Sequence, residues 1–248
     1  MAWNWQNPEW PNFTWDRSRM SGAEEQFLLG AGVVIGSVRH LSEDEHNQLF
    51  VDVMSGEALT TSEIEGEILN RASVQSSIQR QLGLAADKRR ATPAEQGIAE
   101  MMVDLFRSSA EPLSNEMLYR WHQMVAAGRK DLMDIGRYRT GKEPMQVISG
   151  RIGAQKVHFE APPSKRVPSE MKRFIAWFNQ TLPRGAESLP AITRAGIAHL
   201  YFESIHPFED GNGRIGRALA EKAMAQSFGQ PLLVALATTI LAHQKSYY

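Results

Sequence analysis

The most informative stretch of this chain reads His206-Pro207-Phe208-Glu209-Asp210-Gly211-Asn212-Gly213-Arg214-Ile215-Gly216-Arg217. Apolar residues at roughly helical spacing precede it, and the same spacing resumes after it at Ile215, Leu219 and Ala223. Pro207 and the two glycines suit a loop rather than a helix interior, because proline lacks an N–H donor and glycine tolerates tight turns. The sequence therefore predicts a loop that joins two helices and ends at the N-terminus of the second.

This predicted loop has the chemistry of an anion-binding site. Gly211 and Gly213 let backbone N–H groups approach a ligand at a helix N-terminus, where unpaired N–H groups and the helix dipole favour negative charge. Arg214 and Arg217 follow on the first helical turn, although cations there oppose the dipole. Their presence is explained if an anion lies between them, and paired guanidinium groups suit a polyphosphate.

Three further side chains of the loop add a base and a metal ligand. Asp210 supplies a hard carboxylate oxygen, which suits Mg²⁺ shared with phosphates. Asn212 can donate to a phosphate oxygen or cap the helix. His206 can exchange a proton near neutral pH, because an unperturbed imidazole has a pKa of about 6.5. Each feature alone is more often structural, but their combination predicts a site that processes a nucleotide.

The composition limits the class of protein. The chain has 248 residues, of which 42% are hydrophobic and 22% charged, so we expect one large globular domain or one domain with an appendage. The net charge of −1 gives no basic excess for nucleic acid or an anionic membrane. The absence of cysteine excludes disulfides, thiolate zinc sites and a cysteine nucleophile. No leader is evident and the apolar runs 27–38 and 232–242 are short, so we expect a cytoplasmic protein.

Hydrophobic periodicity predicts a mainly α-helical chain with one small β-hairpin. The expected helices cover residues 23–41, 46–54, a segment from Thr60 or Thr61 onward, 93–108, 114–127, 168–179, 190–205 and a segment from Gly213 onward. Gln146-Val147-Ile148 and Lys156-Val157-His158-Phe159 flank a glycine-containing turn and form the expected hairpin. We expect residues 75–90, which are polar, to form a surface turn or a frayed helix end.

The N-terminal half contains a glycine-rich segment and a predicted helix break. The glycine-rich part of residues 23–41 is close to a dinucleotide-binding fingerprint, but its spacing is off by one and no sheet follows. We therefore interpret it as a buried helix whose glycines allow a tight crossing. Ser55-Gly56 is expected to break the second helix, and Ile64, Ile68 and Leu69 to give the third an apolar face.

Four of the six tryptophans lie in the first fifteen residues, at Trp3, Trp5, Trp10 and Trp15. Pro8 and Pro11 stand among them and argue against a helix. Large rings on irregular backbone usually fasten a segment to a neighbouring surface. We expect an N-terminal arm packed in this way, and an aromatic cage for a ligand is the alternative.

The stretch 206–217 resembles the motif of the Fic family, His-x-Phe-x-(Asp/Glu)-Gly-Asn-Gly-Arg-x-x-Arg, at all eight specified positions. A match by chance in a chain of this length has a probability on the order of one in a hundred million. The resemblance implies a mainly α, Fic-type helical bundle with a small β-hairpin flap and a helical N-terminal region. The tryptophan-rich start also resembles the N-terminal domain of one bacterial Fic subgroup.

The resemblance also implies a division of the chain and an activity. Residues 1–90 would form the N-terminal arm and helical region, and residues 91–248 the catalytic core, with the flap near 145–160. Fic enzymes typically transfer AMP from ATP to a hydroxyl of a target protein and release pyrophosphate. We therefore expect ATP and Mg²⁺ as ligands and a protein with a Ser, Thr or Tyr hydroxyl, or this chain itself, as the acceptor. A homodimer is left open.

The resemblance assigns a role to each residue that matches the motif. His206 would be the general base that takes the proton of the target hydroxyl, and Phe208 would pack into the core. Asp210 would bind Mg²⁺ between the α- and β-phosphates. Four residues would cradle the phosphates and one would hold the γ-phosphate: Gly211, Asn212, Gly213 and Arg214 for the cradle, and Arg217 for the γ-phosphate. Tyr247 and Tyr248 resemble tyrosines beside the adenine pocket, or are simply residues at the chain end.

A second motif resembles the inhibitory pattern of the same family, (Ser/Thr)-x-x-x-Glu-(Gly/Asn). It reads Thr61-Ser62-Glu63-Ile64-Glu65-Gly66. The resemblance implies that Glu65 pairs with Arg217 and excludes the γ-phosphate; the plain alternative is a surface glutamate near a helix start.

Removal of AMP by the same site and a silent nucleotide-sensing module are the rival functions. A kinase-like transfer agrees less well with the Gly-Asn-Gly-Arg segment.

Overall fold

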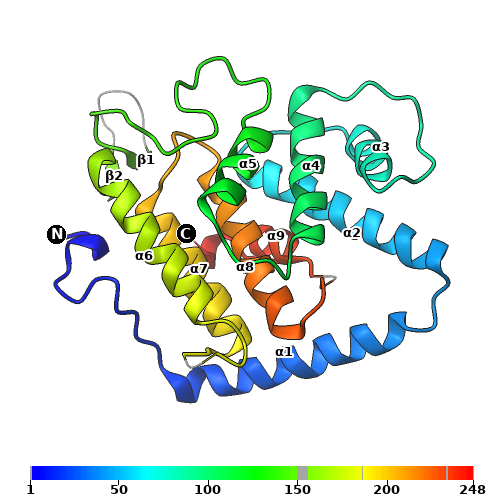
Figure 1. Cartoon of the computed structure of the whole chain (residues 1–248), viewed down its shortest axis with the longest axis horizontal. Helices are drawn as coiled ribbons and strands as arrows, with labels where there is room; N and C mark the ends of the chain where they lie inside the picture. Colours follow the sequence, from blue (N-terminus) through cyan, green and yellow to red (C-terminus); the bar gives the residue numbers. More distant parts are fainter. Residues whose placement is uncertain (1, 150–155, 186, 233, 248) are drawn as a thin grey trace.

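The computed structural model describes residues 2–149, 156–185, 187–232 and 234–247, with backbone only at residues 148, 149, 246 and 247. Its elements in chain order are η1 (Asn4–Gln6), α1 (Arg17–Val38), α2 (Glu43–Ile64), α3 (Arg71–Gln81), α4 (Pro93–Arg107), α5 (Asn115–Val125), β1 (Gln146–Ser149), β2 (Lys156–Glu160), η2 (Ser164–Arg166), α6 (Val167–Gln180), α7 (Ala191–Ile205), α8 (Asn212–Phe228), α9 (Leu236–Ala242) and α10 (Gln244–Tyr247). The prediction of a mainly α-helical chain with one small hairpin is confirmed (Figure 1). Within the described residues no helix is both long and apolar enough to span a membrane.

Helix α8 lies at the centre of the fold and packs most extensively on α7 (Figure 1). It also contacts α2, α4, α5 and α9, so other elements surround most of its length. The side chains of Phe202, Ile205, Ile215 and Leu219 are fully buried where α7 and α8 meet. Residues 206–211 join the two helices, as predicted, so the loop is held at both ends by the best-packed part of the molecule.

The predicted hairpin is present as an antiparallel pair of strands. Gln146 of β1 faces Glu160 of β2, Ser149 faces Lys156, and the register shifts between Val147 and Ile148. The N–H of Ala161 donates to the carbonyl of Met145 at 2.9 Å and continues the pairing beyond the strands. The predicted turn between the strands lies outside the described residues.

The expected break at Ser55-Gly56 is wrong, because α2 runs without interruption from Glu43 to Ile64. Ser42 caps its start in a capping box with Glu45. A glycine inside a helix costs about 1 kcal/mol, but α2 buries Val51, Met54 and Ala58 against the core, and this burial outweighs the cost. A separate third helix from Thr60 or Thr61 is therefore also wrong.

The apolar face expected for that third helix is absent as well. Ile64 is the last residue of α2, and Ile68 lies beyond the helix with its side chain exposed. Leu69 packs, partly buried, against the core from the same connecting segment. The motif from Thr61 to Gly66 consequently lies at the end of a helix and not at a start.

The interpretation of residues 23–41 as a buried helix with a tight crossing is wrong. Helix α1 runs along one edge of the molecule (Figure 1), and Val33 is 68% exposed. In the part of the chain that the structure describes, nothing lies within 4 Å of a Cβ placed at Gly30, Gly32 or Gly36. The helix is attached near its start, where the Glu24 carboxylate accepts the backbone N–H groups of Ile192 and Thr193. The apolar composition of this segment therefore led to a wrong prediction that α1 is buried.

The polar segment 75–90 is only partly as expected. Its first residues belong to α3, which begins after the N-cap Asn70 and buries Val74 and Ile78. The remainder forms an irregular connection to α4. Two buried apolar side chains a helical turn apart are enough to hold a short helix against α2 and α4.

The N-terminal arm packs on the core through its tryptophan rings. The indole N–H of Trp5 donates to the carbonyl of Glu160 at the end of β2, at 2.6 Å. The ring of Trp10 meets Tyr201 edge-on at 5.0 Å, and its N–H donates to Glu170. These contacts agree with the packed arm. The division of the chain at residue 90 stays a prediction.

Candidate active site

The loop after α7 contains two residues with left-handed backbone. His206 has φ 49° and ψ 61°, and Gly211 has φ 79° directly before α8. The left-handed conformation costs a residue with a Cβ roughly 1–2 kcal/mol, so His206 needs support from its surroundings. Arg139 provides it: its Nε donates to the His206 carbonyl at 2.8 Å and its backbone N–H to the Pro207 carbonyl at 2.9 Å.

Phe208 and Asn212 brace the loop from inside. Phe208 is fully buried and stacks on the ring of His122 with centroids 4.1 Å apart. The side-chain amide of Asn212 donates to the Phe208 carbonyl at 2.9 Å, and its oxygen accepts the Phe208 N–H at 3.0 Å. Both ends of this amide are therefore engaged within the loop.

The imidazole of His206 is held in its neutral form. Burial and the nearby charge of Arg139 lower its pKa to about 4. Its Nδ1 lies 3.7 Å from a carboxylate oxygen of Glu203, one helical turn earlier on α7. Desolvation raises the pKa of Glu203 to about 7, against the pull of Arg217. A neutral imidazole has an unprotonated nitrogen, which a general base requires.

Asp210 stands at the mouth of the loop and forms an ion pair with Arg129, which follows α5. Burial alone would raise the pKa of Asp210, but hydrogen bonds from the Gly211 N–H and from Arg129 lower it on balance. In the part of the chain described, no cluster of three or more His, Asp and Glu gathers around a point. A single carboxylate fits Mg²⁺, which keeps most of its ligands as waters and substrate phosphates.

The two arginines of the loop emerge from the first turn of α8 and are almost fully buried. Arg217 is 2% exposed and donates to the hydroxyl and carbonyl of Thr61 at 2.6 and 3.0 Å, and to Glu65 Oε1 at 2.7 Å. Arg214 donates to Glu67 Oε2 at 2.8 Å. Buried cations need partners of opposite charge, and both carboxylates come from the end of α2 and the residues after it.

The carboxylate of Glu65 also lies against the backbone at the start of α8. A Cβ placed at Gly213 would collide with Glu65 Oε1, so only glycine leaves room for this approach. An anion is favoured here by the helix dipole and the unpaired N–H groups. The structure pairs Glu65 with Arg217, the partner that the resemblance implied, and also places it against Gly213, which was not expected. Glu65 lies directly after a helix end rather than near a start.

Beside these residues is a pocket of about 450 Å³ that opens onto the loop. Its lining includes Asp210 and Arg214 of the loop and first turn of α8, together with Arg129 and Glu67. Tyr248 and the side chain of Tyr247 lie outside the described residues, so their predicted place beside an adenine stays a prediction.

Several residues of this site were missed by the sequence reading. Glu67 stands one residue beyond the inhibitory pattern, and Glu203 lies three residues before His206, so proximity to a motif was a usable signal for both. Arg129 and Arg139 had no such signal, because each is more than 60 residues from its partner in the loop. Thr61 was expected as a candidate helix start and as part of the inhibitory pattern, and not as a partner of Arg217.

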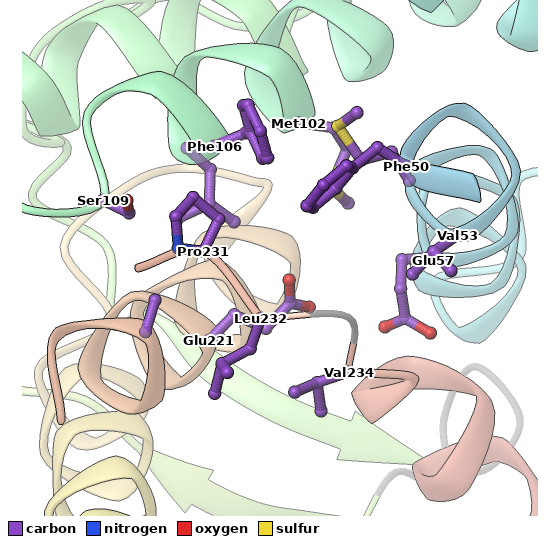
Figure 2. A pocket seen from close by; sticks show the side chains of 13 residues that line it. Phe50, Val53, Glu57, Met102, Phe106, Ser109, Glu221, Pro231, Leu232 and Val234 are labelled. Atoms are coloured by element: carbon purple, nitrogen blue, oxygen red, sulfur yellow. The ribbon is translucent and has the colours of Figure 1, made fainter. Parts of the chain in front are cut away.

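A second pocket lies away from the loop, between α2, α4 and α8 (Figure 2). Its cavity of about 40 Å³ is lined mostly by apolar side chains and is too small for a nucleotide. Figure 2 shows Glu57 and Glu221 on its wall, and burial raises the pKa of both carboxyls. Glu57 also accepts the N–H of Ala237 and so fixes the start of α9 to α2.

Residues 112–224 match the Fic/DOC family, and residues 3–84 match a domain of unknown function, DUF4172. The chain carries a domain of the Fic/DOC family. The Fic match contains the loop with His206, Asp210 and both arginines, whereas Glu65 and Glu67 come from the region of the DUF4172 match. The site is therefore assembled from both regions.

Curated relatives are similar over part of the chain. One is "Protein adenylyltransferase fic-1" of Caenorhabditis elegans, 29% identical over 134 residues, which are 54% of this chain and 23% of that protein. Another is "Probable protein adenylyltransferase aq_aa38" of Aquifex aeolicus (strain VF5), 33% identical over 69 residues, which are 28% of this chain and 20% of that protein. The chain thus matches less than a quarter of the length of either relative.

Solved structures show the Fic fold. A Fic family protein from Desulfovibrio desulfuricans superposes with a TM-score of 0.65 at 23% identity, over 96% of this chain and 66% of that chain. A Fic domain containing signaling protein from Bacteroides thetaiotaomicron gives a TM-score of 0.62 at 18% identity, over 85% of this chain and 76% of that chain. The predicted Fic-type fold is confirmed; the likeness of the tryptophan-rich start to one Fic subgroup stays a prediction.

Proposed function

We propose that this Fic protein is a protein adenylyltransferase, which transfers AMP from ATP to a side-chain hydroxyl of a target protein or of the chain itself. The observation that supports this most is the convergence, at the N-terminus of α8, of a neutral imidazole, a carboxylate and two buried guanidinium groups. The names of the curated relatives support the same class of reaction.

The proposed reaction assigns one task to each of these groups. His206 accepts the proton of the target hydroxyl as its oxygen forms a bond to the α-phosphorus of ATP, and the bond from that phosphorus to the bridging oxygen breaks. Pyrophosphate leaves, while Arg214, Arg217 and the backbone N–H groups at Gly213 balance its charge. Asp210 and the phosphates would hold Mg²⁺, which neutralises charge on the phosphates when bound. A positioned base contributes about 10²–10⁴-fold to such a rate.

We further propose that the protein is autoinhibited in the conformation described. The carboxylate of Glu65 takes both the γ-phosphate partner, Arg217, and the anion position beside Gly213. ATP would then bind only in a pose unsuited to in-line attack. Displacement of Glu65 would open the site.

The hairpin is the proposed contact for the target. Val147 of β1 and Val157 of β2 are partly exposed, and hairpin edges can pair with an extended segment through backbone hydrogen bonds. Arg139 connects the base of the hairpin to the loop, because it donates to the carbonyls of both Pro162 and His206. A target segment on the hairpin would therefore be held at a fixed place relative to His206.

The test compares the wild-type protein, Glu65→Gly, and Glu65→Gly combined with His206→Ala. Each is incubated with Mg²⁺ and α-labelled ATP, with and without cell lysate. We expect protein-bound label with Glu65→Gly and at least a tenfold smaller yield from the other two proteins. Equal labelling by the His206→Ala double variant would contradict the role of the base.

Two parallel measurements identify the rival functions. Transfer of label from γ-labelled ATP would indicate a kinase. Absence of transfer together with intact ATP binding would favour AMP removal, which is then tested on an adenylylated protein, or a nucleotide-sensing module. In either case the adenylyltransferase proposal is overturned.

A further inference from the structure

Arg214 is held by a carboxylate that lies outside the inhibitory motif. Its Nη1 lies 2.8 Å from Oε2 of Glu67, and Asp210, the other nearby acid, is farther away at 4.0 Å. The Arg214 side chain is 7% exposed, whereas that of Glu67 is 36% exposed. Within the described residues, the Nε of Arg214 is also buried without a hydrogen-bond partner. A desolvated guanidinium that donates to one carboxylate has donors left for a further anion.

The backbone after α2 fixes the direction of Glu67. Gly66 has φ 79°, its N–H donates to the Glu63 carbonyl at 2.9 Å, and the N–H of Glu67 donates to the Ser62 carbonyl at 2.9 Å. These two hydrogen bonds form a Schellman motif, which ends a helix with a defined turn. The turn sends the carboxylates of Glu65 and Glu67, on either side of Gly66, toward different arginines.

We propose that Glu67 is a second internal counterion of the phosphate site, and that it sets the affinity for nucleotide polyphosphates independently of Glu65. This inference rests on the proposed function, because it requires that the arginines of α8 bind nucleotide phosphates. Arg214 and Arg217 are three residues apart on α8, so each can exchange its own carboxylate for a phosphate. To bind in the productive pose, ATP must then displace Glu67 from Arg214 as well as Glu65 from Arg217.

The two exchanges differ in the phosphate that causes them. The γ-phosphate is the proposed ligand of Arg217, and ADP lacks it. Arg214 lies beside Asp210, the proposed partner of the Mg²⁺ between the α- and β-phosphates, which ADP retains. At Arg217, Glu65 therefore competes with the γ-phosphate, which ATP alone carries, whereas Glu67 at Arg214 competes with both ADP and ATP.

The experiment measures the Kd of Mg-ADP and of Mg-ATP by titration calorimetry. The proteins are the wild type, Glu67→Gln, Glu65→Gly and the double variant. We expect Glu67→Gln to lower the Kd of both nucleotides about fivefold, which corresponds to about 1 kcal/mol. Glu65→Gly should lower the Kd of ATP and leave that of ADP within about twofold. The double variant should combine both effects on ATP, because the two ion pairs are separate.

Matched controls separate pairing from a general loss of negative charge. Glu63→Gln removes an exposed carboxylate two residues before Glu65, for which the described structure gives no ion pair, and should leave both Kd values unchanged. Glu67→Asp keeps the charge on a shorter side chain and should lie between wild type and Glu67→Gln. Urea unfolding at the same pH verifies that each variant is folded before titration.

Two results would overturn the inference. An unchanged ADP Kd in folded Glu67→Gln, with tighter ATP binding by Glu65→Gly, would reject the role of Glu67 and leave the proposed function intact. Binding of neither nucleotide by any of the folded proteins would reject the inference and the proposed function together.

Discussion

At His206 the backbone takes a left-handed conformation, and burial holds the pKa of the imidazole at about 4. The Fic motif predicted that this residue is a base, but not how the fold keeps it neutral. That depends on Arg139, which braces the loop from 67 residues away and adds a nearby positive charge. A motif specifies residues within the loop, whereas the long-range contacts that set their pKa values appear only after folding.

The depressed pKa of His206 predicts a pH dependence of stability. The unfolded chain binds a proton at this residue with a pKa of about 6.5, whereas the folded protein binds it only near pH 4, so stability falls as pH drops through this window. We expect the loss of unfolding free energy between pH 7 and pH 5 to be about 2 kcal/mol smaller in His206→Ala than in the wild type.

Urea unfolding at the two pH values measures this difference. His122 also has a pKa lowered by burial, to about 4, and contributes in both proteins, so it cancels in the comparison. If the two proteins lost equal stability on acidification, His206 would have an ordinary pKa in the folded state.

At the scale of elements, the sequence predicted both ends of α4 to α7 and the start of α8 to within about two residues. Side-chain caps mark the starts of α4 and α5, and prolines mark those of α6 and α7. The prediction failed for α1 and α2. In α2 the prediction of a break relied on a single glycine and neglected the apolar face that buries Val51 and Met54. In α1 the apolar run suggested burial, whereas burial depends on which neighbours the fold supplies.

Two glycines inside helices give opposite predictions for the change to alanine. Gly56 of α2 has nothing within 4 Å of a built Cβ, so Gly56→Ala should raise the free energy of unfolding by about 0.5–1 kcal/mol. At Gly97 of α4 an added Cβ would collide with the carbonyl of Met124 near the end of α5. Gly97→Ala should therefore lower the free energy of unfolding by roughly 2 kcal/mol.

The measurement is urea denaturation of both variants beside the wild type. The contrast depends on packing, since both positions are helical and helix propensity favours alanine equally at each. Destabilisation by Gly56→Ala would show that α2 is bent or broken at this position, as the sequence alone had suggested.

At the scale of the whole molecule, the site joins parts of the chain that are distant in sequence. Glu65 and Arg217 are 152 residues apart, and two separate motifs allowed their pairing to be predicted. No motif contains Glu67, so its pairing with Arg214 across 147 residues required the structure. The N-terminal arm makes a comparable long-range connection, because Trp5 reaches the end of β2 across 155 residues.

This connection predicts that the arm supports the hairpin beside the loop. Trp5 is buried and its indole N–H donates to the Glu160 carbonyl. Trp5→Ala should therefore lower the free energy of unfolding by about 3 kcal/mol. Trp5→Phe keeps much of the ring but removes the hydrogen bond, and should cost about 1 kcal/mol. Hydrogen exchange should show the largest loss of protection in β2, because that strand loses its support directly.

Trp15→Ala is the matched control, since this ring contacts Arg17 and lies along the groove between α1 and the start of α7. It should leave the exchange of β2 close to that of the wild type. Comparable loss of protection in β2 from both substitutions would mean that the arm stabilises the fold as a whole. A loss confined to Trp5→Ala would instead identify the arm as a specific brace of the hairpin, and hence of the proposed contact with the target.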